Sequence, residues 1–457
     1  MTPRKIAVVG TGYVGLVTAA CLAEIGHQVV ALDIDDGKIS SLRNGKVPIH
    51  EPGLEELVQK HLGSRLTFTN EYSEAIPHAE VVMIAVGTPS DENGDADLSA
   101  VWDVADRIPD YLDEFRVVAV KSTVPVGTCD ELEARLWSEV ARRYPDEPPE
   151  KHVVVVSNPE FLREGRAVSD FMKADRVVIG GTEADAIEKV RQIYLPLRVP
   201  IVTCDRRSSE MIKYASNAFL ATKISFINSI ARLCENLGAD VVKVAEGMGY
   251  DHRITPEHLR AGLGYGGSCF PKDTSALLRM AARTGFDFKL VRAAVEVNAE
   301  QVLWVVHKVE TQLGSLKGAV IAIWGLAFKP GTDDIRDAPS LRLIDALLGR
   351  GAMLRVYDPV ARLTQVPHGV TVCDSPYDAA SGANAIILAT EWKEFSCLDL
   401  HRVRQCVHSA FFVDGRNYMD PEIVRRHGFC YVGLGRSQKA RRVSRSETAA
   451  VPSHQVV

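Results

Sequence analysis

The stretch Ile6-Ala7-Val8-Val9-Gly10-Thr11-Gly12-Tyr13-Val14-Gly15 decides the fold of the first half of the chain. Its four leading apolar residues form a short buried strand, and three glycines follow in the spacing G-x-G-x-x-G. A helix is predicted from about residue 15 to 25, and a second strand over 28–32 ends on Asp33. The glycine spacing alone is a weak signal. Between a strand and a helix, with an acid after the next strand, it predicts a dinucleotide-binding unit.

Each part of this unit has a physical role toward a dinucleotide. Gly10, Gly12 and Gly15 allow a tight turn, a close approach of backbone to pyrophosphate and close helix–strand packing. The positive end of the following helix faces the phosphates. Asp33 would accept hydrogen bonds from ribose hydroxyls and repel a 2′-phosphate, which predicts NAD rather than NADP. A glycine-rich turn without a ligand is the alternative, and the context disfavours it.

Further strands, separated by helical stretches, are predicted over 81–86, 117–120, 153–156 and 177–180. This alternation predicts a parallel sheet with helices on both faces. Thr88 and Thr123 come directly after two of these strands, where an open α/β sheet binds ligands, although each could equally be a loop cap. Glu160 and Glu164 lie four residues apart and would share a face if their segment is helical.

One long helix is predicted over 208–237, because its apolar pattern continues without a break to Gly238. At 1.5 Å per residue it would be ~45 Å long, which exceeds the usual globular helix. We therefore interpret it as a connector and a candidate dimer spine. Lys213 and Asn217 lie one turn apart on it and could point together into a cleft.

A second nucleotide-type fold is predicted from about residue 318, without the glycine spacing of the first. Its strands are predicted over 319–324, 353–357, 385–389 and 411–414. Its first turn offers Lys329 and Arg336, two cations suited to an anionic ligand. The fold class is therefore α/β, with two Rossmann-like, doubly wound parallel-sheet domains joined by a long central helix. The polar, basic stretch after Arg436 is predicted to be a disordered tail.

The stretch Gly264-Tyr-Gly-Gly-Ser-Cys-Phe-Pro-Lys-Asp273 carries the strongest chemical signal. Pro271 suits the first turn of a helix, so Cys269 lies just before a helix N-terminus and near Lys272. Both features are known to lower the pKa of a thiol. A small buried hydrophobe is the alternative for any cysteine. Here the glycines and the Lys-Asp pair favour Cys269 as a nucleophile.

Composition limits the class of protein. The chain has 457 residues and a net charge of −6, so no nucleic acid or anionic membrane is expected as a partner. Its nine cysteines form no C-x-x-C pair, which disfavours disulfides or a metal site and favours a reducing compartment. No apolar run reaches the ~20 residues that span a bilayer. We expect a cytoplasmic protein without a metal.

Two nucleotide folds with a reactive cysteine between them predict a dehydrogenase whose substrate is itself a nucleotide. Simple alcohol oxidation does not require a thiol. A thiol is useful when the product aldehyde is captured as a thiohemiacetal, oxidised again, and released from a thioester by water. We expect such a four-electron oxidation here.

Several motifs together resemble the UDP-glucose/GDP-mannose dehydrogenase family over about residues 5–435. They occupy residues 10–15, 48–55, 121–127, 158–165, 264–273 and 325–330. Phe270 resembles the branch that oxidises UDP-glucose, since the GDP-mannose branch usually has Leu there and UDP-N-acetylhexosamine enzymes usually carry a His-Cys version of the loop. The resemblance implies that UDP-glucose, two NAD and water give UDP-glucuronate and two NADH, in nucleotide-sugar metabolism that supplies polysaccharide biosynthesis.

The resemblance also implies site residues. It places NAD against Gly10, Gly12, Tyr13, Val14, Gly15, Asp33, Lys38, Thr88, Thr123, Glu164, Lys272 and Arg336. It places UDP-glucose against Glu160, Phe161, Leu162, Arg163, Glu164, Lys213, Asn217, His258, Leu259, Arg260, Ala261, Gly262, Gly266 and Lys329. It further implies a homodimer or higher homo-oligomer in which Arg253 reaches the sugar of the neighbouring subunit.

Catalytic roles follow from the same resemblance. Cys269 is the nucleophile, and Lys213 with Asn217 stabilises the developing oxyanion. Asp273 and Thr123 hold a water that takes the hydroxyl proton, and Glu160 is the base for the hydrolytic water.

The domain limits are predicted together with these roles. An NAD-binding domain is predicted over 1–205, and a UDP-sugar-binding domain over 306–436. Between them, a helical central domain over 206–305 carries the cysteine loop and the dimer interface. A tail is predicted over 437–457. A related dehydrogenase acting on GDP-mannose or a UDP-N-acetylhexosamine is the nearest alternative. A non-enzymatic NAD sensor or a decarboxylating hydroxyacid dehydrogenase would have no use for the thiol.

Overall fold

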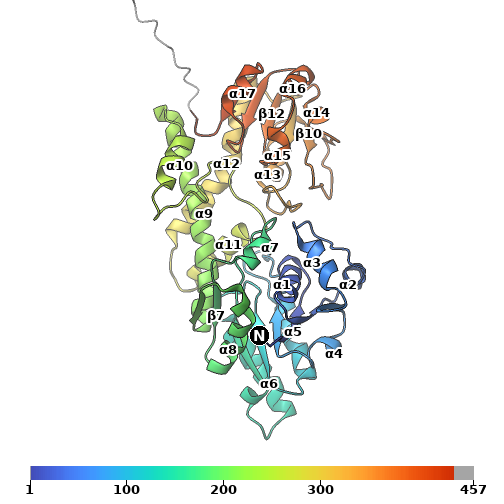
Figure 1. The fold of residues 1–457 in the computed structure, drawn as a ribbon. Helices are drawn as coiled ribbons and strands as arrows, with labels where there is room; N and C mark the ends of the chain where they lie inside the picture. The colour runs from blue at the N-terminus through green and yellow to red at the C-terminus, as the bar shows by residue number, and fades with distance from the viewer. Residues whose placement is uncertain (1, 437–457) are drawn as a thin grey trace, which may run out of the picture.

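The computed structural model describes residues 2–436, so the predicted tail over 437–457 lies outside the described residues. Two α/β lobes are stacked one above the other, the N-terminal lobe at the bottom of Figure 1 and the C-terminal lobe at the top. The long helix α9 runs from the lower lobe toward α10 beside the upper lobe (Figure 1). The predicted fold class is confirmed.

The first lobe contains an eight-stranded sheet in the order β3-β2-β1-β4-β5-β6-β7-β8. Its strands are β1 (Lys5–Val9), β2 (Gln28–Leu32), β3 (Leu66–Thr69), β4 (Val81–Ile84), β5 (Arg116–Val120), β6 (Val153–Ser157), β7 (Val177–Gly180) and β8 (Ile201–Cys204). All neighbours pair in parallel except β6 and β7, which meet antiparallel at Ser157 and Gly180. This reversal is the one departure from the parallel sheet that the sequence predicts.

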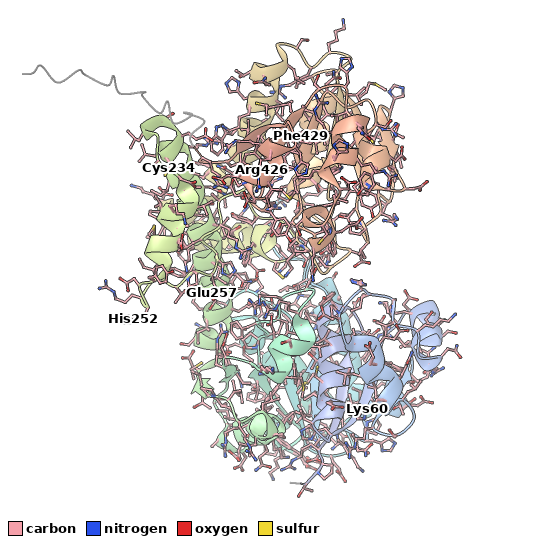
Figure 2. All side chains as sticks on the ribbon, turned by 45° about the horizontal axis from the view of Figure 1, so that its top comes forward. Lys60, Cys234, His252, Glu257, Arg426 and Phe429 are labelled. Atoms are coloured by element: carbon pink, nitrogen blue, oxygen red, sulfur yellow. The ribbon has the colours of Figure 1, made fainter. Side chains whose placement is uncertain are left out.

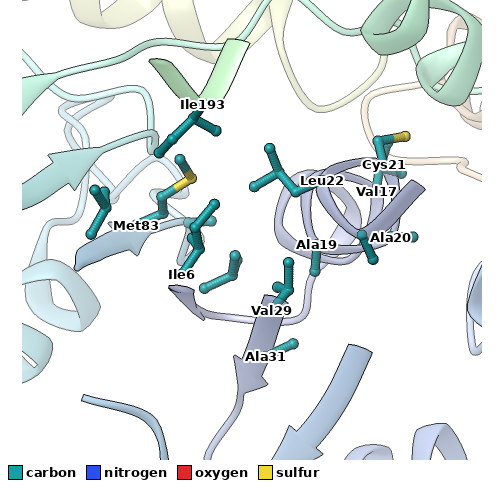
Figure 3. Packing of buried hydrophobic residues seen from close by; sticks show 14 of the residues in the cluster. Ile6, Val17, Ala19, Ala20, Cys21, Leu22, Val29, Ala31, Met83 and Ile193 are labelled. Atoms are coloured by element: carbon teal, nitrogen blue, oxygen red, sulfur yellow. The ribbon is translucent and has the colours of Figure 1, made fainter. Parts of the chain in front are cut away.

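Helices cover both faces of this sheet. They are α1 (Tyr13–Glu24), α2 (Asp36–Arg43), α3 (Leu54–His61), α4 (Tyr72–Ala75), α5 (Ser99–Arg107), α6 (Thr128–Arg143), α7 (Ala167–Met172) and α8 (Ala184–Tyr194). Successive residues of a strand point to opposite faces. On β1, Ile6 therefore joins the core under α1, and Ala7 joins the core under α5 and α6. Figure 3 shows Ile6 and Val29 from the sheet beside Leu22 of α1.

The central region is helical. Its helices are α9 (Arg206–Leu237), α10 (Val241–Gly249), α11 (Phe270–Arg283) and α12 (Lys289–Leu313). Asp205 caps α9 by accepting a hydrogen bond from the Ser208 amide, and Gly238 ends the helix with a φ of 79°. A glycine is suited to that left-handed position, as the sequence predicts for the end of this helix. Among residues 2–436, no helix is long and apolar enough to cross a membrane.

The second lobe contains a six-stranded parallel sheet in the order β11-β10-β9-β12-β13-β14. Its strands are β9 (Val320–Trp324), β10 (Met353–Tyr357), β11 (Val370–Val372), β12 (Ala385–Leu388), β13 (Phe411–Asp414) and β14 (Cys430–Gly433). Its helices are α13 (Pro339–Leu348), α14 (Pro376–Ala380), α15 (Lys393–Ser396), α16 (Leu400–Cys406) and α17 (Pro421–Arg426).

The helix α12 connects the central region to the second lobe. It runs continuously through the predicted boundary between residues 305 and 306. Val302, Val305, Val306 and Val309 on its C-terminal half are buried in the core of the second lobe. The helix therefore serves both regions, and the domain limits stay a prediction.

Candidate active site

A cavity of about 900 Å³ lies where the first lobe, the central helices and the second lobe meet. Its walls come from the loop after β6, one face of α9, the loop that leads into α11, and the turn after β9. The predicted site residues that line it are Glu160, Phe161, Leu162, Arg163, Glu164, Lys213, Asn217, His258, Gly266, Cys269 and Lys329. Segments far apart in the sequence are thus brought to one site.

Lys213 and Glu160 form a buried ion pair in this cavity. The Lys213 Nζ donates to Glu160 Oε1 at 2.8 Å, and both side chains are almost fully buried. Burial alone would raise the pKa of Glu160, but the charge and hydrogen bond of Lys213 hold it below the usual value. Burial likewise opposes the charge of Lys213, yet Glu160 and nearby acidic groups raise its pKa. Both groups are therefore charged at neutral pH.

Glu160 and Glu164 reach the cavity from a loop. Residues 158–165 contain no helical turn, so Glu160 and Glu164 do not share a helical face. Glu160 instead accepts a hydrogen bond from the Leu162 amide, which turns the chain back over the cavity. The two carboxylates still line the same space because the loop folds around it.

Asn217 lies one turn beyond Lys213 and contacts the start of α11. Its Nδ2 donates to Asp273 Oδ2 at 2.5 Å, and Lys272 Nζ donates to Asp273 Oδ1 at 2.6 Å. Asp273 is buried. A buried carboxylate that is held on both oxygens keeps a fixed orientation. The predicted pair on α9 therefore does point into one cleft.

Cys269 occupies the N-cap position of α11, as the sequence predicts, but its environment differs from the expectation. The predicted neighbour Lys272 is paired with Asp273, so it is not directed at the thiol. Burial raises the pKa of the Cys269 thiol, while the nearby charge of Lys213 lowers it only in part. The prediction of a lowered thiol pKa is therefore wrong for the free protein: Cys269 is half-buried, and its partial burial withdraws water that would stabilise a thiolate.

Side chains from the second lobe and from α12 hold the backbone of the Cys269 loop. Asn298 accepts from the Tyr265 amide at 2.8 Å and donates to the Tyr265 carbonyl at 3.1 Å. Arg342 also donates to this carbonyl, and Arg416 donates to the carbonyl of Gly264. None of these residues stands in a recognisable motif, so sequence reasoning missed them.

Gly266 requires the absence of a side chain. An added Cβ there would lie 2.3 Å from the Asp337 carbonyl oxygen, inside contact distance. This close approach of two loops joins the Cys269 loop to the second lobe beside α13. Lys329 reaches the cavity from the preceding turn of that lobe, and burial lowers its pKa.

Glu164 contacts both Arg336, another predicted NAD contact, and the loop that carries the thiol. Its Oε1 accepts from Ser268 Oγ at 2.8 Å and from Arg336 at 3.3 Å. Arg336 is also paired with Asp334 at 2.8 Å. Burial and the neighbouring Asp334 raise the pKa of Glu164 to about 7. Ser268 is a contact that sequence reasoning missed, although it lies beside Cys269.

The predicted substrate loop over 258–262 is only partly directed at the cavity. His258 lines it and packs against Phe270, with ring centroids 6.1 Å apart. The side chains of Leu259 and Ala261 are buried in the core between α9 and α10 instead. Arg260 is exposed. The Gly262 amide donates to Asn228 Oδ1 on α9 at 2.8 Å, so this backbone group is already engaged within the chain.

Arg253 lies outside the cavity of its own chain. Its side chain is 78% exposed and is paired with Asp251 of the same turn. Figure 2 shows the neighbouring His252 projecting away from the body of the molecule. Glu257, at the base of the same loop, lies close to α9 where the lobes meet (Figure 2).

The glycine turn after β1 has the geometry that a dinucleotide needs. An added Cβ at Gly10 would lie 2.8 Å from the Ala85 carbonyl oxygen, whereas a Cβ at Gly12 would meet nothing within 4 Å. The turn is therefore packed on one side and open on the other. Asp33 Oδ2 accepts from the Thr11 amide at 2.7 Å and from Lys38 Nζ at 3.1 Å. Burial opposes the charge of Asp33, but these donors lower its pKa.

Tyr13 links this turn to the active-site loop. Its hydroxyl is hydrogen-bonded to Glu51, and the Gly165 amide donates to it at 2.7 Å. Thr88, after β4, donates to the carbonyl of Thr123 at 2.9 Å, so these two predicted contacts are neighbours. The residues of the glycine turn fit a bound NAD, whose pyrophosphate would face the open N-terminus of α1.

Comparison with known proteins places this chain. Domain models of the UDP-glucose/GDP-mannose dehydrogenase family match it in the NAD binding domain over residues 4–198, the central domain over 207–300 and the UDP binding domain over 322–421. The chain belongs to this family. The predicted family membership and the predicted NAD cofactor are thereby confirmed.

Relatives of this dehydrogenase cover nearly its whole length. It is 45% identical over 441 residues to UDP-glucose 6-dehydrogenase of Bacillus subtilis, covering 95% of this chain and 93% of the relative. It is 46% identical to UDP-glucose 6-dehydrogenase of Pseudomonas aeruginosa, and the match covers 94% of this chain and 97% of the relative. A solved UDP-glucose dehydrogenase from Pyrobaculum islandicum matches with a TM-score of 0.86 and 37% identity, covering 95% and 98%.

One buried cation in the cavity of this dehydrogenase has no role among the sequence predictions. Lys121 Nζ lies 3.4 Å from both the Asn158 carbonyl and the Tyr194 hydroxyl. Burial lowers the pKa of Lys121 to about 8. Lys121 follows the strand over 117–120 in the sequence, but only the structure shows that its side chain lines the cavity.

Proposed function

We propose that this enzyme oxidises C6 of UDP-glucose twice and releases UDP-glucuronate. The observation that carries the proposal is one cavity that holds a thiol, a buried Lys–Glu pair and an amide together. Simple alcohol oxidation does not need Cys269, whereas oxidation to an acid does. The relatives named UDP-glucose 6-dehydrogenase, at 45–46% identity, support UDP-glucose over GDP-mannose or a UDP-N-acetylhexosamine.

The residues of the site have distinct roles in this proposal. NAD, when bound, accepts one hydride in each oxidation. Asp273, with Thr123, orients the water that takes the hydroxyl proton. Lys213 and Asn217 stabilise negative charge on the C6 oxygen, because a preorganised cation and an amide donor in a buried site need little reorganisation.

Cys269 separates the second oxidation from release of the product. Its sulfur attacks the aldehyde carbon, so that a carbon–sulfur bond forms and the carbonyl electrons move to oxygen. Loss of a hydride from C6 then leaves a thioester. Glu160 takes a proton from water as it attacks this thioester, and the sulfur leaves. Its ion pair with Lys213 keeps Glu160 ionised for this role.

We also propose that the enzyme is a homodimer or a higher homo-oligomer formed through α9. Its exposed face carries four large apolar side chains, which we call the α9 stripe: Phe219, Phe226, Leu233 and Leu237. Half or more of each side chain is exposed. A row of exposed large apolar side chains along one helix is typical of an interface. Phe219 also lines the cavity, so a partner on the stripe would reach the site.

We also propose that the enzyme works in a reducing compartment, which we take to be the cytoplasm. All nine cysteines lie in the described part of the chain and all are free thiols there. A nucleophilic thiol must stay reduced to work.

Cys269→Ala tests the proposed function. The NADH formed per UDP-glucose should be two for the unmodified enzyme. Turnover of the variant should fall by about 10³-fold or more, because the aldehyde is no longer captured. Cys397→Ala, which removes an exposed thiol in the second lobe, is the matched control and should behave normally. Near-normal formation of two NADH by Cys269→Ala would contradict the thiol mechanism.

A further inference from the structure

Ser268 lies between the nucleophile and a carboxylate. Its Oγ is 3.6 Å from Cys269 Sγ and 2.8 Å from Glu164 Oε1. Among residues 2–436, this hydroxyl is the hydrogen-bond partner of the thiol. The three groups form a continuous chain from the sulfur to a buried carboxylate, and the mechanism above gives Ser268 no role.

The direction of this chain follows from counting hydrogens. A serine hydroxyl has one hydrogen and two lone pairs. While Glu164 is ionised it can only accept, so the hydroxyl hydrogen of Ser268 points to Glu164. The thiol hydrogen of Cys269 must then point to Ser268. While Glu164 is ionised, each proton therefore faces the atom that would receive it.

Glu164 has the properties of a proton acceptor. It is buried, and no donor within residues 2–436 reaches its Oε2. When protonated, Glu164 shares a hydrogen bond with the Asp334 carboxylate, so a proton that it accepts has a place in the site. Burial and Asp334 raise its pKa to about 7, which is close to the working range of a general base. Asp334 raises the pKa of Glu164 and Arg336 lowers it. The charge of Glu164 in turn raises the pKa values of Lys329 and Tyr13.

Other carboxylates near the thiol are already engaged. Glu160 is paired with Lys213, and Asp273 is held by Asn217 and Lys272. Both raise the pKa of Cys269 through their charge, but neither is hydrogen-bonded to its sulfur in the described structure. Because burial also disfavours the thiolate, the sulfur needs an acceptor for its proton when it attacks.

We infer that Ser268 and Glu164 form a proton relay that deprotonates Cys269 as it attacks the aldehyde. The inference rests on the proposed function for the identity of the electrophile. The thiol proton moves to Ser268 Oγ, and the hydroxyl proton of Ser268 moves to Glu164. The sulfur electron pair forms the bond to C6, and the carbonyl electrons move to oxygen. Reversal of the relay returns the proton when the thioester sulfur leaves.

The relay and a purely electrostatic role for Glu164 predict opposite effects of Glu164→Gln. Glutamine keeps an oxygen that accepts from Ser268, but it cannot take a proton. Removal of a negative charge near a thiol lowers its pKa, so simple electrostatics predicts faster reaction of Cys269 with an alkylating agent. The relay predicts slower reaction, because the acceptor is lost.

The test measures alkylation of Cys269 by iodoacetamide between pH 5.5 and 9.5, in the full-length enzyme without substrate or cofactor. Peptide mass spectrometry assigns the modified cysteine. The rate in the unmodified enzyme should rise through about pH 7, since Glu164 must lose its proton before it can accept another. At pH 8, Ser268→Ala and Glu164→Gln should each react about 10-fold more slowly and lose this rise.

Two further variants complete the design. Ser268→Thr keeps the hydroxyl and should restore most of the rate. Ser275→Ala is the matched control, since it removes a serine hydroxyl of α11 that donates to the Gly94 carbonyl away from the thiol, and its pH profile should be unchanged. Normal or faster alkylation in Glu164→Gln would overturn the relay. Because the assay needs no turnover, this result stands apart from any failure of the proposed UDP-glucose oxidation.

Discussion

At the scale of a single residue, we expect Asp33 to set the preference between NAD and NADP. Its carboxylate is ionised and held by donors from Thr11 and Lys38 at the end of β2. A 2′-phosphate there would place two negative charges in contact. We therefore expect kcat/KM for NAD to exceed that for NADP by at least about 10-fold, or about 1.4 kcal/mol. Asp33→Ala should weaken the binding of NAD and reduce the ratio of kcat/KM for NAD to kcat/KM for NADP.

The control for this prediction is a neighbouring carboxylate. Asp35 caps α2 by accepting from the Lys38 amide at 2.9 Å, so Asp35→Ala changes charge nearby without removing the ribose acceptor. It should keep the preference for NAD. Equal kcat/KM for both cofactors in the unmodified enzyme would refute the role of Asp33.

Some site residues were predictable because their signal is local. Lys213 and Asn217 are spaced by one helical turn, and Asp33 follows directly from the strand that carries it. Ser268 is different, because its partner Glu164 lies 104 residues away in the sequence. The prediction of a lowered pKa for Cys269 was also wrong for a non-local reason. The burial of this thiol depends on loops from both lobes, and no local sequence pattern indicates it.

At the scale of elements, the α12 helix positions the Cys269 loop. Asn298 is buried on this helix and makes two hydrogen bonds to the backbone of Tyr265. Asn298→Ala would leave a buried amide unpaired, which costs about 1–3 kcal/mol of folding free energy. We also expect kcat to fall by at least about 10-fold, since a nucleophile displaced by ~1 Å loses much of its rate. Urea unfolding and NADH formation measure the two effects.

Asn384→Ala is the matched control for the Asn298 prediction. Asn384 accepts from the Val320 amide at 2.8 Å at the start of β9, away from the cavity. Its loss should cost comparable stability but leave kcat unchanged. If both variants lose stability and both keep normal kcat, α12 does not position the nucleophile.

The strands that sequence reasoning missed share one property. They are β3, β8, β11 and β14, the edge strands of the two sheets. The strands that it predicted are interior to the sheets and read as apolar runs, because a strand buried on both faces needs apolar residues at every position. Edge strands pair on one side only, and β8 and β11 are mostly unburied. The sequences of these two strands therefore lack the apolar signal, whereas β3 and β14 are mostly buried but alternate with polar or small residues.

At the scale of the whole molecule, the active site exists only where the lobes meet. An added Cβ on Gly165, in the loop after β6, would lie 2.6 Å from the Gly331 carbonyl oxygen of the second lobe. The sequence predicts both nucleotide folds and the helix between them. It does not predict this contact, because no periodicity or motif encodes how the two lobes approach each other.

If the enzyme is a dimer, we predict that Arg253 of one protomer completes the active site of the other. This side chain is exposed and lies outside the cavity of its own chain, while the α9 stripe leads from a candidate interface to the cavity rim at Phe219. If Arg253 enters the partner's cavity, Arg253→Ala and Cys269→Ala should each be nearly inactive alone. A hybrid dimer would contain one intact site, formed by Cys269 of one protomer and Arg253 of the other.

The measurement is the activity of mixed protomers after subunit exchange. At equal amounts, half of the dimers are hybrid and each has one of two sites intact, so about a quarter of the normal activity should return. Mixing Cys269→Ala with the double variant Arg253→Ala/Cys269→Ala is the control and should return none. Exchange is verified with differently tagged protomers. If exchange is complete and the first mixture stays inactive, Arg253 does not complete the partner's site, and the apolar stripe on α9 needs another explanation.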